Sequence, residues 1–435
     1  MAAFACGISV LCGLTCSAIP RQLLARKVDV SATLQAGSSS HSGDRRSRAF
    51  WLALMTVEVA LTTLLCCEAA LLFKSFERLT QVRLGFTPQN LLAVRVHLPS
   101  VEYPDGAGRI AAVAELKSAF ARIPGVQSIG LITFMPLGGM ISTSPVEISD
   151  GVRQVHRNGQ SYLEVADTAY FSTMRIPIVA GRPFAPSDKL GGRAVCVINQ
   201  AFARQYFGSQ DPVGKVIRVG QSPDNSTVVG VVGDIRQDLD AMPKPIVYLA
   251  FNQFPWTEFD IIVRTLQPPG ELSDTARRAI WTVNPQLPIL RTTTMGTVLR
   301  KGLWNPRLRS LFMVTYASLS ILLTVAGLCA VVSYIVRRRY REIAIRIAVG
   351  ATRSQVFRWV VKIGVAPLVS GVALGILLTM FADHLVAAFL YGVSPRDAAT
   401  FAMVGLFVFV VGVVPLCVPA WRAIQQDPSI TLRAL

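Results

Sequence analysis

Charged residues are scarce in this chain of 435 residues, at 16% of the total, and they are absent from most of its long apolar runs. A helix needs about 20 apolar residues to cross a hydrocarbon core. Five runs of about this length cover residues 2–19, 51–73, 311–336, 363–382 and 398–420. Four of the five contain no Asp, Glu, Lys or Arg, whereas a soluble surface helix keeps a polar face. The sequence therefore predicts an α-helical integral membrane protein with about five spans.

Cysteine and histidine are also sparse outside these runs. Seven of the eight cysteines lie in the predicted spans, and only Cys196 does not. An internal disulfide in the rest of the chain is therefore excluded. The four histidines are scattered without the spacing of metal ligands. We predict no metal site and no cofactor.

Motifs for catalysis are missing as well. Residues 208–215 contain a Gly-Lys pair, but the glycines are spaced wrongly for a phosphate loop, and Val216 stands where Ser or Thr must bind magnesium. Residues 133–144 contain no nucleophile elbow. Asp234, Asp238 and Asp240 could bind a cation, although a solvated turn is the favoured interpretation. We therefore expect a protein without enzymatic activity and without ATPase motifs of its own.

Positive charge sets the orientation of the spans, because short loops rich in Lys and Arg stay in the cytoplasm. Residues 21–50 and 337–358 are both rich in arginine. Both loops are therefore predicted inside, with the C-terminus cytoplasmic and residues 74–310 outside. Much of the net charge of +17 then belongs to the inner loops and faces membrane lipids, so we predict no nucleic-acid binding.

The first predicted span begins directly after Met1, without the positive region that opens a signal peptide. A short repeat accompanies it: residues 25–34 and 423–432 share Ala, Asp, Ser, Thr and Leu at equal spacing. We interpret residues 1–20 as the end of a preceding module whose beginning is missing, and residues 21–50 as a cytoplasmic linker. An unusual anchor is the alternative for the first span, and chance similarity is the alternative for the repeat.

The outer segment, residues 74–310, alternates strand-like and helix-like patterns. A strand, a helix and a strand are predicted over 91–98, 108–122 and 126–134. The pattern returns with a strand over 259–264, a helix over 273–283 capped by Ser273, and a strand over 287–293. Between these units lie short strands over 194–198, 216–219 and 228–232 and a helix over 200–207. We predict an α+β domain with an inserted, more β-rich subdomain.

Two carboxylates, Glu58 and Glu68, lie within the span over residues 51–73. Ionisable groups inside a bilayer are costly and mark candidate functional sites. Ten residues of helix place the two about 80° apart, so they need not share one pathway. Glu68 is also close enough to Lys74 to be partly solvated. Structural pairing is the favoured interpretation, and a proton or substrate contact is the alternative.

The inner loop between the third and fourth spans carries the strongest pattern. Ile343 and Ile347 form a helical stripe, Gly350 can end that helix, and Thr352 with Gln355 forms a capping box for the next one. Such a loop can bind a partner protein and transmit its movement to the membrane spans. A lipid-binding amphipathic segment is the alternative.

Residues 341–352 resemble the signature of the FtsX-like permease domain found in ABC transporter permeases of the MacB type. The outer segment adds Tyr-Phe at 170–171, Gly-Arg-Pro-Phe at 181–184, Val-Ile-Asn at 197–199, Asp-Pro-Val-Gly-Lys at 211–215 and Val-Val-Gly-Asp at 231–234. These motifs resemble the MacB-like periplasmic core domain. The resemblance covers nearly the whole chain from Trp51. The partial extra span further resembles the acidobacterial duplicated orphan permeases, in which two modules run in tandem.

The resemblance implies a bacterial plasma-membrane permease with an outer MacB-like core domain over 74–310 and an FtsX-like domain with three spans over 311–435. A separate ABC ATPase would dock on the inner loop, with Arg341, Glu342, Arg346 and Gly350 as coupling residues. Further implied partners are a second permease module or a second copy, and an adaptor protein. Glu68 departs from the family, which usually has a small residue there. Efflux or extraction of a substrate, or mechanical regulation of an envelope enzyme without transport, both remain open.

Overall fold

The computed structural model describes residues 41–149, 159–220, 225–339, 343, 352–387 and 389–425. The chain divides into two compact units. A helical unit combines residues up to Cys67 with Tyr316–Ala382 and Ala398–Leu435, and an outer unit combines Glu68–Thr315 with Asp383–Asp397. Each unit is described by itself below.

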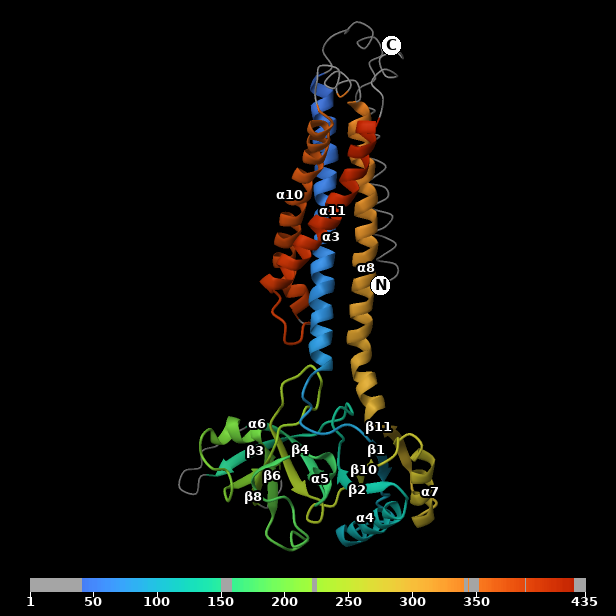
Figure 1. The fold of residues 1–435 in the computed structure, drawn as a ribbon. Coiled ribbons are helices and arrows are strands. Elements are labelled where there is room, and N and C mark those ends of the chain that lie inside the picture. The colour runs from blue at the N-terminus through green and yellow to red at the C-terminus, as the bar shows by residue number, and fades with distance from the viewer. Residues whose placement is uncertain are drawn as a thin grey trace. The chain divides into compact units, whose positions relative to one another are not determined.

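Four helices are long and apolar enough to cross a membrane in the part of the chain that the structure describes. They are α3 (His41–Thr80), α8 (Met295–Arg338), α10 (Arg353–Ala387) and α11 (Ala398–Gln425) (Figure 1). Four of the predicted spans are thus helices of the expected kind, and the span over 2–19 lies outside the described residues. The helices α3, α8 and α10 extend well beyond the predicted runs. The additional residues at the ends of these helices include charged ones, and hydropathy alone does not detect helical segments that contain charged residues.

The outer unit contains two interlocked strand-helix-strand motifs. The first consists of β1 (Leu91–His97), α4 (Gly106–Ala121) and β2 (Val126–Ile132), and the second of β10 (Glu258–Thr265), α7 (Ser273–Val283) and β11 (Ile289–Thr294). The strands run in the order β11-β1-β10-β2, and each neighbour is antiparallel to the next. Each motif therefore places its two parallel strands on either side of a strand from the other motif, as in split strand-helix-strand folds.

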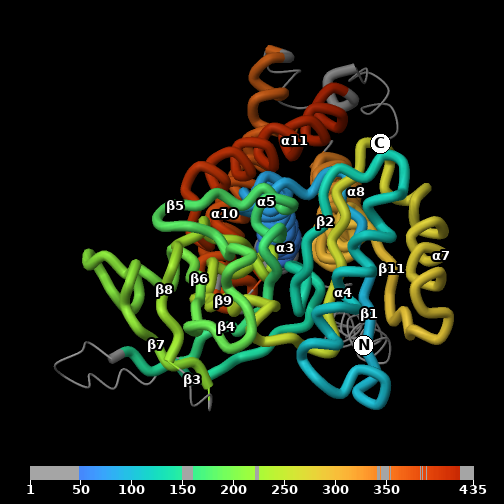
Figure 2. The backbone as a smooth tube through the Cα atoms, turned by 90° about the horizontal axis from the view of Figure 1, so that it is seen from below, coloured from blue at the N-terminus to red at the C-terminus, as the bar shows by residue number. Residues whose placement is uncertain are grey.

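The predicted insertion lies between β2 and β10. It contains β3 (Thr143–Ser149), β4 (Gly159–Ala166), α5 (Tyr170–Met174), β5 (Ile178–Gly181), β6 (Val195–Asn199), β7 (Val216–Val219), β8 (Asn225–Val232) and β9 (Ile246–Ala250). A single residue pair, Ile132 with Ala166, joins β2 to β4 and makes the sheet continuous. Figure 2 shows the strands of the insertion beside the part of the domain that carries α4 and α7. The predicted α+β domain with a β-rich insertion is confirmed.

The core of this domain fills both faces of the sheet. Along β1, Leu92, Val94 and Val96 belong to a cluster that includes Phe120 of α4. Leu91 and Ala93 belong instead to a second cluster, which includes Tyr170 of α5. Alternate side chains of a strand point to opposite faces. Both faces of β1 are therefore covered, which explains its unbroken apolar sequence.

Two local predictions need correction. Ser273 does not cap α7, because the capping residue is Leu272 and no side chain hydrogen-bonds to the first turn. The helix predicted over 200–207 begins as α6 (Gln200–Phe202) and continues as a π-helical turn, η1 (Ala203–Phe207). Asn199 caps α6, with its side chain accepting from the Phe202 N–H at 3.0 Å. The backbone N–H of Gly208, at φ 62°, donates to the Ala203 carbonyl, and this i→i−5 bond is typical of a π-turn.

Candidate functional site

The predicted coupling residues Arg341, Glu342, Arg346 and Gly350 lie outside the described residues. The structure does describe part of their surroundings. Ile343 is buried, and its N–H donates to the Arg339 carbonyl at 2.9 Å. Where α10 begins, the Gln355 side chain accepts from the Thr352 backbone N–H at 3.0 Å. This is the glutamine half of the predicted capping box.

Within the helical unit, polar side chains connect α3 to α8. The hydroxyl of Thr62 lies 2.6 Å from the hydroxyls of both Ser320 and Thr324. One turn away, the Glu58 carboxylate fills the space beside Gly327, where an added Cβ would lie 2.5 Å from both carboxylate oxygens. Hydrogen bonds between helices add stability inside a bilayer. Glu58 therefore lies at a packed interface between two helices, next to a cluster of hydroxyls.

Glu68 does not fit the expectation of partial solvation beside Lys74. The residue is only 6% exposed, and its Oε2 atom has no hydrogen-bond partner in the described part of the chain. Lys74 forms an ion pair with Asp397 instead. The expectation was wrong, since Glu68 is buried and Lys74 pairs with a carboxylate that is distant in sequence.

The close approach of α3 and α10 was missed by the sequence reasoning. An added Cβ at Gly371 would lie 2.6 Å from Val59 Cβ, and one at Gly375 would lie 2.5 Å from Thr63 Cβ. The available signal was Gly371 and Gly375 four residues apart in an apolar run, a spacing that lets helix backbones pack closely in membranes. These glycines set the packing distance between α3 and α10.

The chain between α10 and α11 contacts α3 and α8 within the outer unit. We call residues 389–397 the outer connection. Its Tyr391 N–H donates to the Ser75 hydroxyl of α3 at 2.8 Å, and its Asp397 pairs with Lys74. Phe389 lies under the Arg309 guanidinium of α8, 4.9 Å from carbon to ring centre. The outer connection therefore contacts both α3 and α8 within the outer unit.

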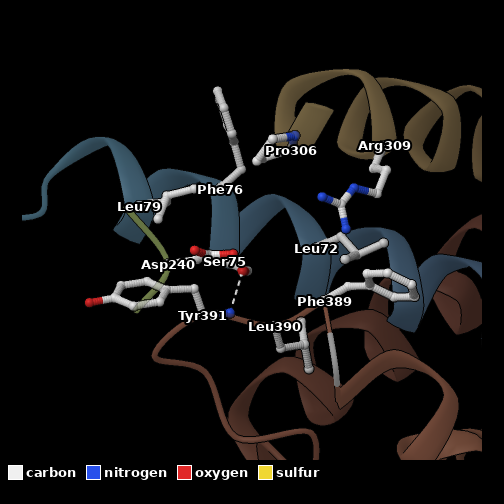
Figure 3. A pocket seen from close by; sticks show the side chains of 10 residues that line it. All are labelled: Leu72, Ser75, Phe76, Leu79, Asp240, Pro306, Arg309, Phe389, Leu390 and Tyr391. Atoms are coloured by element: carbon white, nitrogen blue, oxygen red, sulfur yellow. Dashed lines mark hydrogen bonds between the residues drawn. The ribbon is translucent and has the colours of Figure 1, made fainter. Parts of the chain in front are cut away.

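A cavity of about 110 Å³ lies among these contacts. Its wall consists of residues of α3, α8, the outer connection and the loop after β8 (Figure 3): Leu72, Ser75, Phe76, Leu79, Asp240, Pro306, Arg309, Phe389, Leu390 and Tyr391. All of them belong to the outer unit. The cavity is a structural feature that the sequence did not indicate.

The core of the α+β domain contains a buried ionic cluster. Asp260 accepts from Arg95 Nη1 at 2.8 Å and from the Met135 N–H at 3.0 Å. Glu164 accepts from the Phe134 N–H at 3.0 Å. Burial raises the pKa of both carboxyls, and for Asp260 the charge of Arg95 opposes this rise. The two carboxyls bind the backbone of residues 134 and 135, where the chain leaves β2 for the insertion. This structural role explains why Glu164 and Asp260 are buried, and no catalytic role is needed.

In the acidic cluster of the loop after β8, Asp234 is engaged by protein groups. Asp234 accepts from the Ala201 N–H at 2.6 Å and pairs with Arg204, so it stabilises the start of α6. Among the described residues, no three His, Cys, Asp or Glu side chains are grouped so that they could hold a metal ion. Asp234 is therefore a structural residue rather than a solvated one.

Comparison with known proteins identifies two domains in the chain. Residues 79–282 match the family model described as MacB-like periplasmic core domain. Residues 314–428 match the model described as FtsX-like permease C-terminal. The first match covers the α+β domain up to α7, and the second covers most of α8 with α10 and α11.

The chain is similar to several named proteins. It is 26% identical to the pyoverdine export ATP-binding/permease protein PvdT of Pseudomonas syringae pv. syringae, over 79% of this chain and 51% of that protein. It is 26% identical to the macrolide export ATP-binding/permease protein MacB of Chromobacterium violaceum, over 70% of this chain and 45% of that protein. The chain therefore spans about half the length of these relatives.

The chain is also similar to a protein named as a permease and to one solved structure. The uncharacterized ABC transporter permease YknZ of Bacillus subtilis is 24% identical over 61% of this chain and 68% of that protein. The crystal structure of the periplasmic region of MacB from Actinobacillus actinomycetemcomitans aligns with a TM-score of 0.35 and 14% identity. That alignment covers 50% of this chain and 94% of the solved one.

Proposed function

We propose that this chain, which combines a MacB-like periplasmic core domain with an FtsX-like permease C-terminal domain, is the permease subunit of an ABC-type exporter. A separate ATPase docks on the inner loop, and ATP hydrolysis moves the outer domain. The printed names of the relatives, which include pyoverdine export and macrolide export, support export as the direction. The printed name of YknZ, an ABC transporter permease, supports an ATPase on a separate chain as the energy source.

The arrangement in the membrane follows the charge of the loops. The outer domain, residues 74–310, faces away from the cytoplasm of a bacterial plasma membrane, and the C-terminus is cytoplasmic. Residues 21–50 form a cytoplasmic linker, and residues 311–435 form the permease domain with three spans. The repeat in residues 25–34 and 423–432 supports a second permease module as a partner, in the tandem order of duplicated permeases. A second copy of this chain is the other way to supply that module.

The observation that carries the proposal is the length and position of α8. It has 44 residues, or about 66 Å of helix, against a hydrocarbon core of about 30 Å. It begins at Met295, directly after the edge strand β11 ends at Thr294, and it ends at Arg338, beside the inner loop. No residue lies between the strand and the helix in the sequence. The chain thus runs from the outer sheet through α8, which contains Pro306, to the inner loop, and we infer that this helix carries the movement.

Arg341, Glu342, Arg346 and Gly350 are the proposed coupling residues. Arginine forms bidentate pairs with carboxylates, so Arg341 and Arg346 suit an acidic surface on the ATPase. We expect the double variant Arg341→Glu, Arg346→Glu to insert into the membrane normally and to lose stimulation of the ATPase. Affinity purification from the native membrane identifies the ATPase, and its hydrolysis rate is then measured with each permease variant in vesicles.

The matched control is Arg358→Glu, which reverses an exposed charge at the start of α10. This variant is expected to keep at least half of the stimulation. Equal stimulation by the wild type and the double variant would rule out the coupling residues. A preparation that contains wall hydrolases or no ATPase would instead favour the alternative role, a regulator that transmits force to an envelope enzyme. Copurification of an adaptor protein would favour export.

A further inference from the structure

The cavity in Figure 3 adjoins a second one. The first measures about 110 Å³ and the second about 240 Å³. Leu79, Asp240, Pro306 and Arg309 line both, so the two share a wall. Drug-sized ligands occupy roughly 300–1,000 Å³. Each cavity by itself is too small for such a ligand but has room for a head group or a short apolar tail.

Arg309 and Asp240 contribute opposite charges to both cavities, yet each lacks an ionic partner. Arg309 stacks on Phe389, and its one hydrogen bond, to the Asn305 carbonyl of its own helix, is long at 3.4 Å. Within the described residues, no carboxylate lies within 4 Å of Arg309 and no cation within 4 Å of Asp240. The two groups thus share a cavity without pairing with each other. A ligand that carries both a negative and a positive charge fits between them.

The rest of the first cavity is apolar. Leu72 and Leu79 of α3 are 8% and 5% exposed, and Phe76 and Leu390 complete this part of the wall. In Figure 3 the side chains of Leu72, Leu390 and Phe389 lie on the side where Arg309 reaches the cavity. An amphipathic ligand therefore finds apolar contacts beside the cation. Free inorganic ions gain nothing from such a wall.

We propose that these cavities bind the head group and the first carbons of a zwitterionic phospholipid, one whose head group joins a phosphate to an ammonium. Arg309 binds the phosphate with charge-assisted hydrogen bonds, and Asp240 binds the ammonium. The lipid is the chosen source because the cavity residues of α3 and α8 lie within or next to the apolar runs 51–73 and 311–336 of the same helices, which are both candidate membrane spans. Bound there, the lipid contacts the outer connection and both long helices, and it stabilises that contact.

The test is retention of lipid by the full-length chain. The protein is purified from nanodiscs that contain equal amounts of phosphatidylethanolamine and phosphatidylglycerol, and the bound lipids are counted by native mass spectrometry. The wild type is expected to retain phosphatidylethanolamine selectively. Arg309→Gln is expected to lower retention of both lipids about tenfold, because both carry a phosphate. Asp240→Asn is expected to lower only the retention of phosphatidylethanolamine, because phosphatidylglycerol has no ammonium.

Two matched controls keep the same charge changes outside the cavities. Arg300→Gln removes an exposed arginine earlier in α8, and Glu115→Gln removes an exposed carboxylate from α4. Both are expected to retain lipid as the wild type does, and circular dichroism checks that all variants are folded. Equal retention by all folded variants, or equal binding of the two lipids by the wild type, would overturn the proposal. No ATPase takes part, so the result does not depend on the proposed exporter function.

Discussion

Gly375 of α10 has no space for even one methyl group. An added Cβ would lie 2.5 Å from Thr63 Cβ and 2.6 Å from the Ala60 carbonyl oxygen of α3. Both are backbone or near-backbone atoms that a rotamer change cannot move. We expect Gly375→Ala to lower the free energy of unfolding by about 1–3 kcal/mol, the usual cost of overpacking. Thermal unfolding in detergent measures the effect.

The matched control for this prediction is Gly405→Ala in α11. There an added Cβ would meet side-chain atoms of Ile376 and Val372 at 3.4 Å, which is close to ordinary contact. This substitution is expected to leave the thermal midpoint unchanged or to raise it, because alanine is a better helix former than glycine. If both variants unfolded at the wild-type temperature, the close packing of α3 on α10 would be disproved.

Glu164 is a buried carboxyl whose titration affects the stability of the α+β domain. Burial raises its pKa well above the ordinary value of 4.5, so the folded state holds a proton that the unfolded state releases first. The free energy of unfolding therefore falls as pH rises from about 4.5 toward the folded-state pKa. We expect Glu164→Gln to flatten this fall and to stabilise the protein at pH 7.

The measurement is urea unfolding between pH 4.5 and 8, with near-ultraviolet dichroism of the outer domain as the signal. Glutamine keeps an acceptor for the Phe134 N–H, so the variant is expected to fold. Asp260 has a raised pKa for the same reason, and part of the slope will remain in the variant. The exposed Glu147, replaced by glutamine, serves as control. An unchanged slope in Glu164→Gln would contradict the assignment.

At the scale of the elements, the outer connection contacts both α3 and α8. The ion pair between Lys74 of α3 and Asp397 is about one-third and one-quarter exposed, so its own contribution to stability is small, about 0.2–1 kcal/mol. Its position matters more, because it attaches the connection to α3. We expect Asp397→Lys to reduce ATPase stimulation while leaving the thermal midpoint nearly unchanged.

The exchanged pair, Lys74→Asp with Asp397→Lys, is expected to recover most of the stimulation, because it restores opposite charges at the same positions. Failure of the exchanged pair to recover any stimulation would show that the ion pair is not what matters. The ATPase assay in vesicles used for the coupling residues applies here without change.

The strands and helices that sequence patterns predicted are those with clear local signals. Leu91–His97 and Gly106–Ala121 were predicted closely because one is a continuous apolar run and the other has helical periodicity. The strands β3, β4, β5 and β9 were missed. The strands β5 and β9 are short, at 4 and 5 residues, whereas β3 and β4 have 7 and 8 residues and their length does not explain the miss. Ser273 was taken as a cap from its residue type, but capping depends on backbone geometry that the type alone does not fix.

The candidate sites were less predictable than the elements. Tyr391 bonds to Ser75 across 316 positions of sequence, and no local pattern pairs a backbone N–H with a distant serine. Arg309 likewise has no sequence feature that distinguishes it from other arginines near α8. Glu58 and Glu68 were detected because a carboxylate in an apolar run is conspicuous, yet their different surroundings depend on neighbouring helices.

For the whole molecule, the proposed orientation places the outer domain and the C-terminal tail on opposite sides of the membrane. Val101 of the outer domain is 94% exposed, so a cysteine there is open to solvent. The native Cys196 is fully buried, and burial raises the pKa of its thiol, so it reacts slowly. We expect Val101→Cys to react with a membrane-impermeant maleimide in intact spheroplasts. Ala434→Cys, in the tail, is expected to react only after permeabilisation.

The wild-type chain measures labelling of the native cysteines and serves as the background. Both variants must react when the membrane is dissolved in detergent, which shows that each new thiol is accessible. Labelling of Ala434→Cys in intact spheroplasts, with Val101→Cys protected, would reverse the orientation. The arginine-rich inner loop would then lie outside, beyond the reach of a cytoplasmic ATPase, and the exporter proposal would fail with it. Orientation is therefore the condition on which the assignment of the coupling residues depends.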